Sequence, residues 1–386
     1  MWTYFFTGTV VFWLGSALVC AAVGYAVVAL VALFKSLRTT TPVPHAGAQP
    51  CAISVLKPLR GAESHLYENL RGFCLQSAAN VQLIFGVRET QDPAIAVVHQ
   101  LRVEFPQLDI ELVVDPTVYG ANLKVSNLLN MLPRARHEWL VLADSDISVP
   151  ADYLTRVTAP LADPGVGIVT CLYFAVPRAG FWSRLGGLFI DDWFAPSVRL
   201  AHAFGSRRFA FGSTIALRRE TLQAIGGFEV LSDTLADDFW LGELTRQAGL
   251  RTVLSELMVG TDVSETSLAQ LWGHELRWLR TIRAVAPGGF ALSFVCFTWP
   301  VSLLGLALAP TLLNLCLTLV ACAARVVQYF LVRRGRPGSS AWFEVLFTPV
   351  RDLLLLLEWA VALTGWRVKW RGQVLHARKD GPIRYP

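Results

Sequence analysis

Uncharged positions are gathered into two long stretches, one near each end of the chain. Residues 1–34 carry no charged side chain, and the run from Val10 to Phe34 has 25 residues. A helix of that length exceeds the roughly 30 Å of hydrocarbon in a bilayer. A cleaved signal peptide would have a basic start and a shorter apolar core, which this segment lacks. The pattern therefore predicts a retained membrane span.

The second uncharged stretch lies between Arg283 and Arg325 and has 41 residues. It is long enough for two spans, with a turn expected near Pro310 and Asn314. A weaker third candidate covers about 343–364 and either spans the membrane or lies along its interface. Three charged residues interrupt it: Arg351, Asp352 and Glu358.

Short apolar runs alternate with helical patterns between these stretches, over residues 51–283. Strands are expected at 52–56, 81–87, 109–114 and 138–143, and helices at 63–76, 93–105 and 121–132. This alternation is typical of βαβ units and a parallel sheet. The predicted organisation is a membrane anchor (1–38), a linker (39–50), an α/β domain (51–283) and a C-terminal membrane region (284–386) with two to three helices and a basic tail.

Composition supports a membrane protein that carries a folded domain. Hydrophobic residues make up 53% of the chain and charged residues only 16%, against about 25% in ordinary globular proteins. The net charge of +5 is too small to indicate a nucleic-acid binder. None of the seven Cys forms a CxxC pair, which argues against a zinc site or a disulfide framework.

The basic residues predict an orientation and a source. Clusters of Lys and Arg follow the first expected span, precede the second and follow the third, so they fit one side of the membrane. The positive-inside rule makes that side cytoplasmic. Only five of the 34 basic residues are Lys, a bias common in GC-rich genomes. We therefore expect a bacterial inner-membrane protein with its catalytic domain in the cytoplasm.

Polar side chains follow every expected strand of the α/β domain. In parallel sheets a ligand lies beyond the carboxyl ends of the strands. Solvated loop ends would explain any one of these residues, but the whole set favours a site at this edge. Its members are Lys57, Pro58 and Arg60, then Glu89 and Asp92, then Asp115, and finally Asp144 and Asp146.

Two pairs of carboxylates carry candidate chemistry. Asp144 and Asp146 follow an expected buried strand at i, i+2 spacing, where both can face one Mg²⁺ or Mn²⁺ ion together with substrate phosphates. The alternative is a turn pair before Pro150. Asp237 and Asp238 precede an expected helix at 239–248. Helix capping explains one of them, and a general base that accepts a hydroxyl proton explains Asp238.

Arg277 and Trp278 lie just before the second uncharged stretch. Anchoring at the membrane surface would explain them, and so would a guanidinium that holds a diphosphate. Arg280 and Arg283 are expected to be anchoring residues only.

These motifs together resemble the ceramide glucosyltransferase family, which are membrane-bound lipid glycosyltransferases with a GT-A core, and the bacterial hopanoid-associated glycosyltransferases. The resemblance implies an α/β, GT-A-type (Rossmann-like) domain with flanking transmembrane helices. It rests on SVLKPLRGAESHLYENLRGFCLQ (54–76), VRETQDPA (87–94), GANLKVSNL (120–128), LADSDI (142–147), ADDFW (236–240) and HELRW (274–278).

The resemblance also implies roles for individual residues. Asp238 would be the catalytic base, and Asp144 and Asp146 would bind the sugar nucleotide and its Mg²⁺ or Mn²⁺. His274 departs from the Gln or Arg usual at its position, which leaves its role open. The remaining nucleotide-sugar ligands would be Lys57, Asp92, Lys124, Asn127, Arg277 and Trp278.

The expected function is therefore inverting transfer of one hexose, glucose or N-acetylglucosamine, from a UDP-sugar to a lipid hydroxyl of ceramide or a hopanoid. The aromatic segment 180–211 is expected at the membrane interface, where it would admit the lipid, or as an ordinary buried helix. Residues 211–214 could form the floor of the acceptor pocket. Two alternatives remain: a processive polysaccharide synthase, which would need more spans, and a non-catalytic membrane-tethered binding module.

Overall fold

The computed structural model describes residues 2–38, 52–334, 342–370 and 373–376. The expected linker at 39–50 and most of the basic tail lie outside this range. The described residues form two compact units. The sheet unit takes its residues from Thr41–Val176 and Ser206–Asp262, and the helical unit from Met1–Thr40, Pro177–Gly205 and Val263–Ala377. The predicted domain boundaries remain predictions, because these units follow a different division of the chain.

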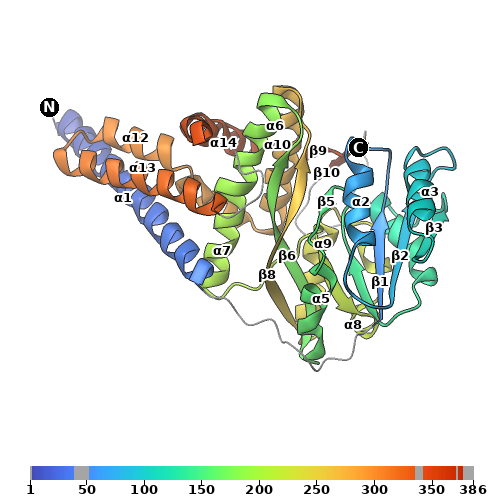
Figure 1. Cartoon of the computed structure of the whole chain (residues 1–386). Helices are drawn as coiled ribbons and strands as arrows, with labels where there is room; N and C mark the ends of the chain where they lie inside the picture. The colour runs from blue at the N-terminus through green and yellow to red at the C-terminus, as the bar shows by residue number, and fades with distance from the viewer. Residues whose placement is uncertain (1, 39–51, 335–341, 371–372, 377–386) are drawn as a thin grey trace. The chain divides into compact units, whose positions relative to one another are not determined.

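Half of the sheet is parallel, as the alternating pattern predicts (Figure 1). The strands β1 (Ile53–Pro58), β2 (Val81–Val87), β3 (Asp109–Val114) and β4 (Trp139–Leu142) lie in the order β3-β2-β1-β4 and pair in parallel. Strand β1 runs two residues further than expected, so Lys57 and Pro58 end the strand rather than follow it.

The other half of the sheet contains antiparallel pairs, so the sheet is mixed rather than parallel throughout. β7 (Ile215–Arg218) pairs antiparallel with β4 and with β6 (Val166–Pro177), and β5 (Ile147–Ser148) pairs antiparallel with β8 (Arg251–Val263). β6 and β8 run in the same direction, since the N–H of Arg251 donates to the carbonyl of Gly165 at their starts and that of Arg178 to the carbonyl of Val263 at their ends. Only residues 143–146 separate β4 from β5, which lies at the edge of the sheet rather than beside β4.

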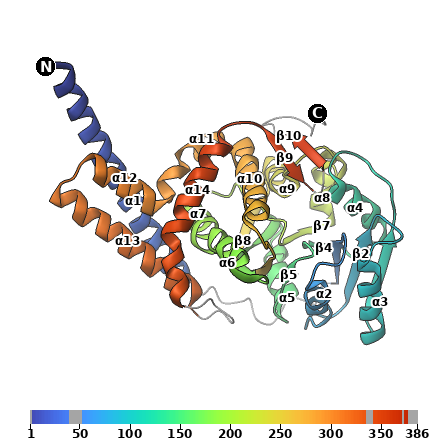
Figure 2. The same cartoon turned by 90° about the horizontal axis from the view of Figure 1, so that it is seen from above.

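Helices cover both faces of the sheet (Figure 2). Side chains alternate across a strand, so Val55 packs into one apolar cluster and Leu56 into the other. The first cluster includes residues of α2 (Leu66–Cys74), α3 (Ala94–Glu104) and α5 (Tyr153–Thr158). The second includes residues of α4 (Leu123–Met131), α8 (Arg219–Ala224) and α9 (Asp237–Gln247).

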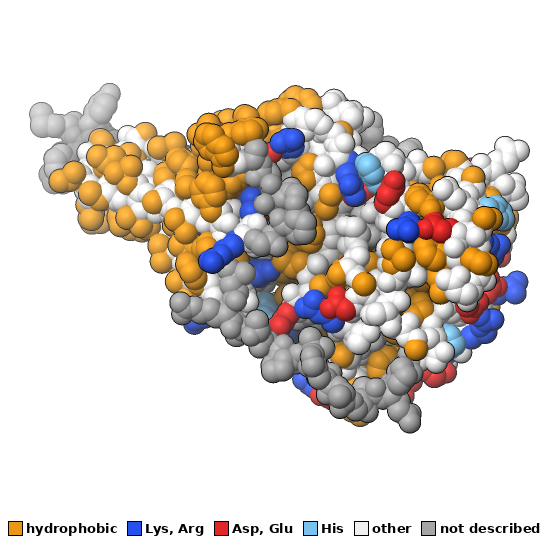
Figure 3. Space-filling view, viewed as in Figure 1, with side chains coloured by type: hydrophobic (Ala, Val, Ile, Leu, Met, Phe, Trp, Pro, Cys, Tyr) orange, Lys and Arg blue, Asp and Glu red, His pale blue; other side chains and the backbone are white. Residues whose placement is uncertain are grey.

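In the helical unit, α1 (Trp2–Arg38) packs along α12 (Thr298–Leu308) and α13 (Leu312–Arg333) (Figure 2). Gly15 and Gly305 allow this contact, because a Cβ on Gly15 would lie 2.7 Å from the carbonyl oxygen of Gly305. Small residues commonly allow such close approach between membrane helices. Hydrophobic side chains gather on the surface of these three helices (Figure 3).

Two helices among the described residues are long and apolar enough to cross a membrane: Gly8–Ser36 and Leu312–Arg333. The first agrees with the expected anchor. Two spans were expected in 284–324 with a turn near Pro310, and residues 309–311 do separate α12 from α13. Before that turn, Pro287–Cys296 and Thr298–Leu308 form a pair bent by 71°, which the sequence did not indicate. That pair is either a broken span or a re-entrant segment.

The weak third candidate contains η6 (Trp342–Phe347) and α14 (Thr348–Ala362). Helix α14 has 15 residues, or about 22 Å of rise, which is shorter than a bilayer core. Its charges are buried in ion pairs rather than exposed to lipid. Arg351 contacts Glu275 and Glu358, and Asp352 lies 2.9 Å from Arg325.

The segment expected at the membrane interface is helical and belongs mostly to this unit. It contains α6 (Gly180–Phe189), the π-helical turn η3 (Ile190–Phe194) and α7 (Ala195–Ala203). Asp192 in η3 accepts from Arg333 of α13 at 2.7 Å. Arg333 and Arg283 are only 7% and 6% exposed, so both stabilise the unit internally. The expectation that Arg283 anchors at the surface is therefore wrong.

Candidate active site

The Asp144–Asp146 segment is held from two sides. The backbone N–H of Asp144 donates to the carbonyl of Gly212 at 3.2 Å, and the N–H of Asp262 donates to the carbonyl of Asp146 at 3.0 Å. β5 starts at the next residue and pairs with β8. The two carboxylates are therefore fixed between the end of β4 and the start of β5.

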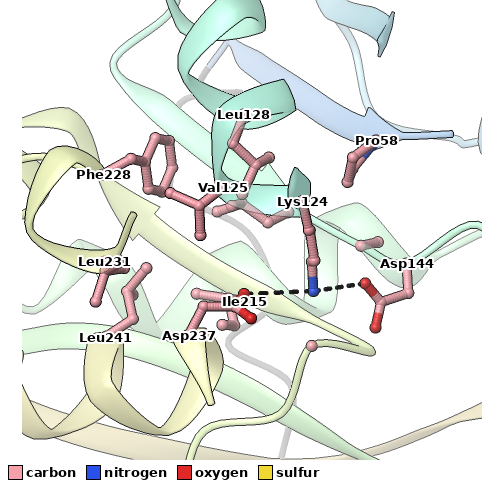
Figure 4. A pocket seen from close by; sticks show the side chains of 13 residues that line it. Pro58, Lys124, Val125, Leu128, Asp144, Ile215, Phe228, Leu231, Asp237 and Leu241 are labelled. Atoms are coloured by element: carbon pink, nitrogen blue, oxygen red, sulfur yellow. Dashed lines mark ion pairs between the residues drawn. The ribbon is translucent and has the colours of Figure 1, made fainter. Parts of the chain in front are cut away.

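Lys124 lies between carboxylates from two other segments (Figure 4). Its Nζ is 2.7 Å from Oδ1 of Asp144 and 3.6 Å from Oδ2 of Asp237. Burial opposes the charge on this lysine, but the nearby Asp144, Asp237 and Asp238 outweigh it and raise the Lys124 pKa well above its usual value. Lys124 is therefore a permanently charged ammonium group at the centre of the cluster.

The sequence reasoning missed Asn122, which positions Lys124. Its Oδ1 accepts from the backbone N–H groups of Lys124 and Val125, and its Nδ2 donates to Asp237 at 3.2 Å. It therefore caps α4 and joins the two helix N-termini that carry the site. Asn just before a helical pattern is the preferred N-cap and could have marked this residue.

Asp238 opens α9 and faces the 211–214 turn. It accepts from the backbone N–H of Gly212 at 3.0 Å and from that of Phe239 at 2.8 Å. The residue is half-buried. Burial and the neighbouring Asp237 raise the pKa of Asp238 to about 6, although Lys124 and the two backbone donors oppose the shift. The carboxylate is ionised at neutral pH but is a stronger base than an ordinary Asp.

Asp146 has an even more strongly shifted carboxyl group. Burial raises its pKa to about 7, and Asp144 and Glu63 add to the shift, while a hydrogen bond from Thr261 opposes it. The charge of Asp144 thus disfavours ionisation of Asp146, as expected for a carboxylate beside another carboxylate. Among the residues that the structure describes, no group of three His, Cys, Asp or Glu side chains could hold a metal. Mg²⁺ sites often combine one or two carboxylates with substrate phosphates, so the metal-binding role of Asp144 and Asp146 remains a prediction.

Lys57 supports this loop from within the sheet. Its side chain is fully buried, donates to the backbone carbonyl of Asp144 at 2.8 Å and lies 3.6 Å from the ring centroid of Phe73. Burial lowers the pKa of Lys57 to about 7 against the opposing effect of Asp146 and Asp144. Its observed contacts position Asp144 through the backbone.

Asp92 and Asn127 form hydrogen bonds with the backbone. Asp92 accepts from the N–H of Gly61 and from that of Ala94, at the start of α3. Asn127 donates to the carbonyl of Gly86 at 2.8 Å. Their predicted contacts with a nucleotide remain predictions.

Arg277 and Trp278 lie on α10 (Leu268–Val285), which belongs to the helical unit. The Trp278 ring packs against Phe189 at 5.3 Å and His274 at 4.3 Å between centroids. His274, which stands where the family usually has Gln or Arg, also contacts Glu265. The predicted diphosphate contact of Arg277 remains a prediction.

A small cavity opens beside the carboxylate cluster. Its polar side is formed by Lys124, Asp144 and Asp237, and Gly212 completes it. Figure 4 shows Lys124 pointing from α4 between the two carboxylates. Apolar residues close the cavity from behind, among them Val125, Leu128, Ile215, Phe228 and Leu241.

The fold is that of a GT-A glycosyltransferase. A mannosyltransferase from Pyrobaculum calidifontis, solved in complex with GDP-Man and Mn²⁺, superposes with a TM-score of 0.55 at 19% identity. The match covers 92% of this chain and 96% of that one. At this identity the likeness shows the fold, and it confirms the predicted fold class.

The family model described as "Glycosyl transferase family 21" matches residues 16–383. The chain belongs to this family and is a sugar-transferring enzyme, which sets aside the non-catalytic binding module.

Two curated relatives agree. Ceramide glucosyltransferase 3 of Caenorhabditis elegans is 22% identical over 86% of this chain and 74% of its own length. A beta-monoglucosyldiacylglycerol synthase of Synechocystis sp. is 27% identical over 54% of this chain and 41% of its own length. The predicted resemblance to the ceramide glucosyltransferases is therefore confirmed.

Proposed function

We propose that this enzyme is an inverting glycosyltransferase that moves one hexose from a UDP-sugar to a hydroxyl group of a membrane lipid. The donor sugar would be glucose or N-acetylglucosamine, and the acceptor ceramide or a hopanoid. The observation that carries the proposal is the cluster at the N-termini of α4 and α9, where Lys124 lies between Asp144 and Asp237 beside Asp238.

Asp238 is the proposed base. Its carboxylate is half-buried, and its pKa of about 6 leaves it ionised at pH 7 yet basic enough to accept a proton. The lipid oxygen attacks the anomeric carbon on the face opposite the diphosphate. A carbon–oxygen bond to the lipid forms, the bond to the diphosphate breaks with its electron pair, and the hydroxyl proton moves to Asp238. An α-linked donor gives a β-linked product.

Lys124 is the proposed partner of the departing diphosphate. It is the ammonium group within the cavity, and only 15% of its side chain is exposed. A phosphate oxygen can replace the carboxylate of Asp144 as its ion-pair partner. The proposed further contacts of the nucleotide and diphosphate come from Lys57, Asp92, Asn127, Arg277 and Trp278.

The two carboxylates that follow β4 also fit a divalent cation. Asp144 and Asp146 would hold Mg²⁺ or Mn²⁺, and release of Asp144 from Lys124 would free an oxygen for it. When bound, the ion would offset the negative charge that develops on the leaving diphosphate.

The lipid acceptor is supported by the relatives and by the helical unit. The relatives are named for glucosylation of ceramide and for a glucosyldiacylglycerol. Two helices among the described residues are apolar and long enough to cross a bilayer. We propose an integral protein of a bacterial inner membrane with the sheet unit in the cytoplasm.

The test uses the full chain in nanodiscs with radiolabelled UDP-glucose, UDP-N-acetylglucosamine or GDP-mannose. Ceramide, a hopanoid polyol or diacylglycerol is supplied as acceptor, and products are identified by lipid mass spectrometry. The proposal predicts one sugar per lipid from a UDP donor, and loss of transfer in Asp238→Asn. A polymer product would favour the polysaccharide synthase instead.

A further inference from the structure

His274 has no role in the proposed function, yet its side chain joins a loop to the Trp278 ring. It lies on α10 four residues before Trp278, so both rings share one face of the helix. Their centroids are 4.3 Å apart, with an angle of 59° between the ring planes. Nδ1 of His274 contacts Oε1 of Glu265, which lies between β8 and α10. The imidazole therefore links Glu265 to the indole of Trp278.

The contact between Glu265 and His274 has a defined direction. Only 11% of the Glu265 side chain is exposed. Burial opposes the charge on this carboxylate, but the hydrogen bond from His274 outweighs it and lowers the Glu265 pKa. An ionised carboxylate can only accept, so Nδ1 of His274 donates. This hydrogen bond fixes the orientation of the imidazole ring.

Glu265 is itself held by the start of α10. The side chain of Ser267 accepts from the N–H of Gln270 at 3.3 Å, and the side chain of Gln270 accepts from the N–H of Thr266 at 2.8 Å. Two reciprocal bonds of this kind fix the entry of a helix, as in a capping box. Gly186 of α6 packs beside the loop, since a Cβ there would lie 3.7 Å from Oε2 of Glu265. The carboxylate is therefore a firm support for His274.

The Trp278 ring carries this constraint on to Arg277. The guanidinium carbon of Arg277 lies over the indole, 6.0 Å from its centroid, within the range of a cation–π contact. The same ring packs against Phe189 of α6 at 5.3 Å between centroids. A change in the orientation of Trp278 would therefore move the guanidinium group that lies over it.

We propose that Glu265 and His274 are positioning residues that orient Trp278, and through it Arg277, toward the diphosphate of the donor. The inference rests on the proposed function, in which Arg277 and Trp278 contact that diphosphate. The pair acts through the indole and touches no nucleotide atom itself. It should therefore determine affinity for the phosphates and leave affinity for the nucleoside unchanged.

The first readout follows the Trp278 ring directly. The full-length enzyme is labelled with fluorotryptophan in nanodiscs, and the fluorine resonance of Trp278 is identified by its absence from Trp278→Phe. His274→Leu and Glu265→Ala should shift and broaden this resonance, because the indole loses its support. Glu265→Gln should retain the wild-type resonance, since its amide oxygen can still accept from Nδ1–H.

The second readout separates positioning from general damage to the fold. Affinities for UDP and for uridine are measured by isothermal titration calorimetry at saturating Mn²⁺. His274→Leu and Glu265→Ala should weaken UDP binding several-fold and leave uridine binding unchanged, and Glu265→Gln should restore UDP affinity. The control is His65→Leu, because the side chains of His65 and His274 are similarly exposed, at 34% and 35%, and His65 lies 3.9 Å from Glu68. It should change neither readout.

Two results would overturn the inference. One is a Trp278 resonance that stays unchanged in both His274→Leu and Glu265→Ala. The other is an equal loss of UDP and uridine affinity, which would mean that the pair only supports the fold. The resonance needs no nucleotide, so a shifted resonance in a protein that binds no UDP would refute the proposed donor alone. UDP binding that is indifferent to both variants would refute the positioning role alone.

Discussion

Replacing Asp238 by Asn should make the enzyme more stable while it removes transfer activity. Burial and Asp237 raise the pKa of Asp238 to about 6 from its usual 3.8. The difference of about 2.2 units corresponds to about 3 kcal/mol at 1.36 kcal/mol per unit. Because this carboxyl has a raised pKa in the folded state, its contribution to stability is complete below pH 3.8. It is lost as the pH rises through about 6.

Asn carries no charge to desolvate, so the variant avoids this penalty. Linkage gives a stability gain of up to about 3 kcal/mol at pH 7.5, falling to about half of that at pH 5. The gain should appear as a higher thermal denaturation midpoint in detergent, with a larger difference at pH 7.5. Loss of the base should lower kcat by about 10²–10⁴-fold. In the wild type at saturating Mn²⁺, transfer should rise with pH and level off above about 6.

The matched control is Asp152→Asn on the surface of the sheet unit, where 57% of the Asp152 side chain is exposed. It should change neither the activity nor the pH dependence of the midpoint. Full activity in Asp238→Asn would refute its role as base. A destabilised Asp238→Asn variant at pH 7.5 would refute the reasoning from burial, because it would mean that the ionised form is favoured by the fold.

Three further changes test the site and its supports. Gly212→Ala should lower kcat/KM by roughly 10–100-fold with little change in the midpoint, because its Cβ would lie 2.7 Å from Asp144 and 2.9 Å from Lys124 and displace that ion pair. Mn²⁺ binding, followed by electron paramagnetic resonance, should tighten from pH 6 to pH 8, since Asp146 has a pKa of about 7 and must lose its proton first; chelation should abolish transfer. Arg351→Met should lower stability by about 3–5 kcal/mol, seen in the denaturation midpoint, because it leaves two carboxylates buried without their partner.

Each of these has an outcome that contradicts it. Gly72→Ala is the control for Gly212→Ala, since its Cβ would meet only an ordinary contact at 3.6 Å; equal activity in both variants would show that the ion-pair geometry is not needed. Mn²⁺ affinity that ignores pH would exclude Asp146 as a ligand. An Arg351→Met variant of unchanged stability would show that the buried ion pairs do not hold α10 against α14.

Local patterns predicted the elements that local forces determine. The boundaries of β2 and β3 agree with the expected ones. β2 is almost wholly buried, and its run is mostly apolar, whereas β3 is a partly exposed edge strand with polar residues in its first half. The antiparallel pairs of the sheet were not predicted, since strand direction depends on connections over more than a hundred residues. The bend before α12 was also missed, because an uncharged stretch gives length but not direction.

The same contrast holds at the site. Asp144, Asp238 and Lys124 were found as motif residues, and the structure brings them together. Asn122 was not assigned to the site, and Gly212 was expected only as part of an acceptor-pocket floor, because the observed roles of both come from contacts with residues far along the chain. Asn122 joins α4 to Asp237, and Gly212 holds both the backbone of Asp144 and the carboxylate of Asp238.

The stereochemistry of a single product tests the central claim most directly. Purified enzyme is given an α-linked UDP-sugar and one lipid acceptor, and the anomeric configuration of the glycolipid is read by proton nuclear magnetic resonance. The account predicts one β-linked hexose per lipid from the wild type and a rate lower by about 10²–10⁴-fold from Asp238→Asn. An α-linked product, or full activity in Asp238→Asn, would contradict it.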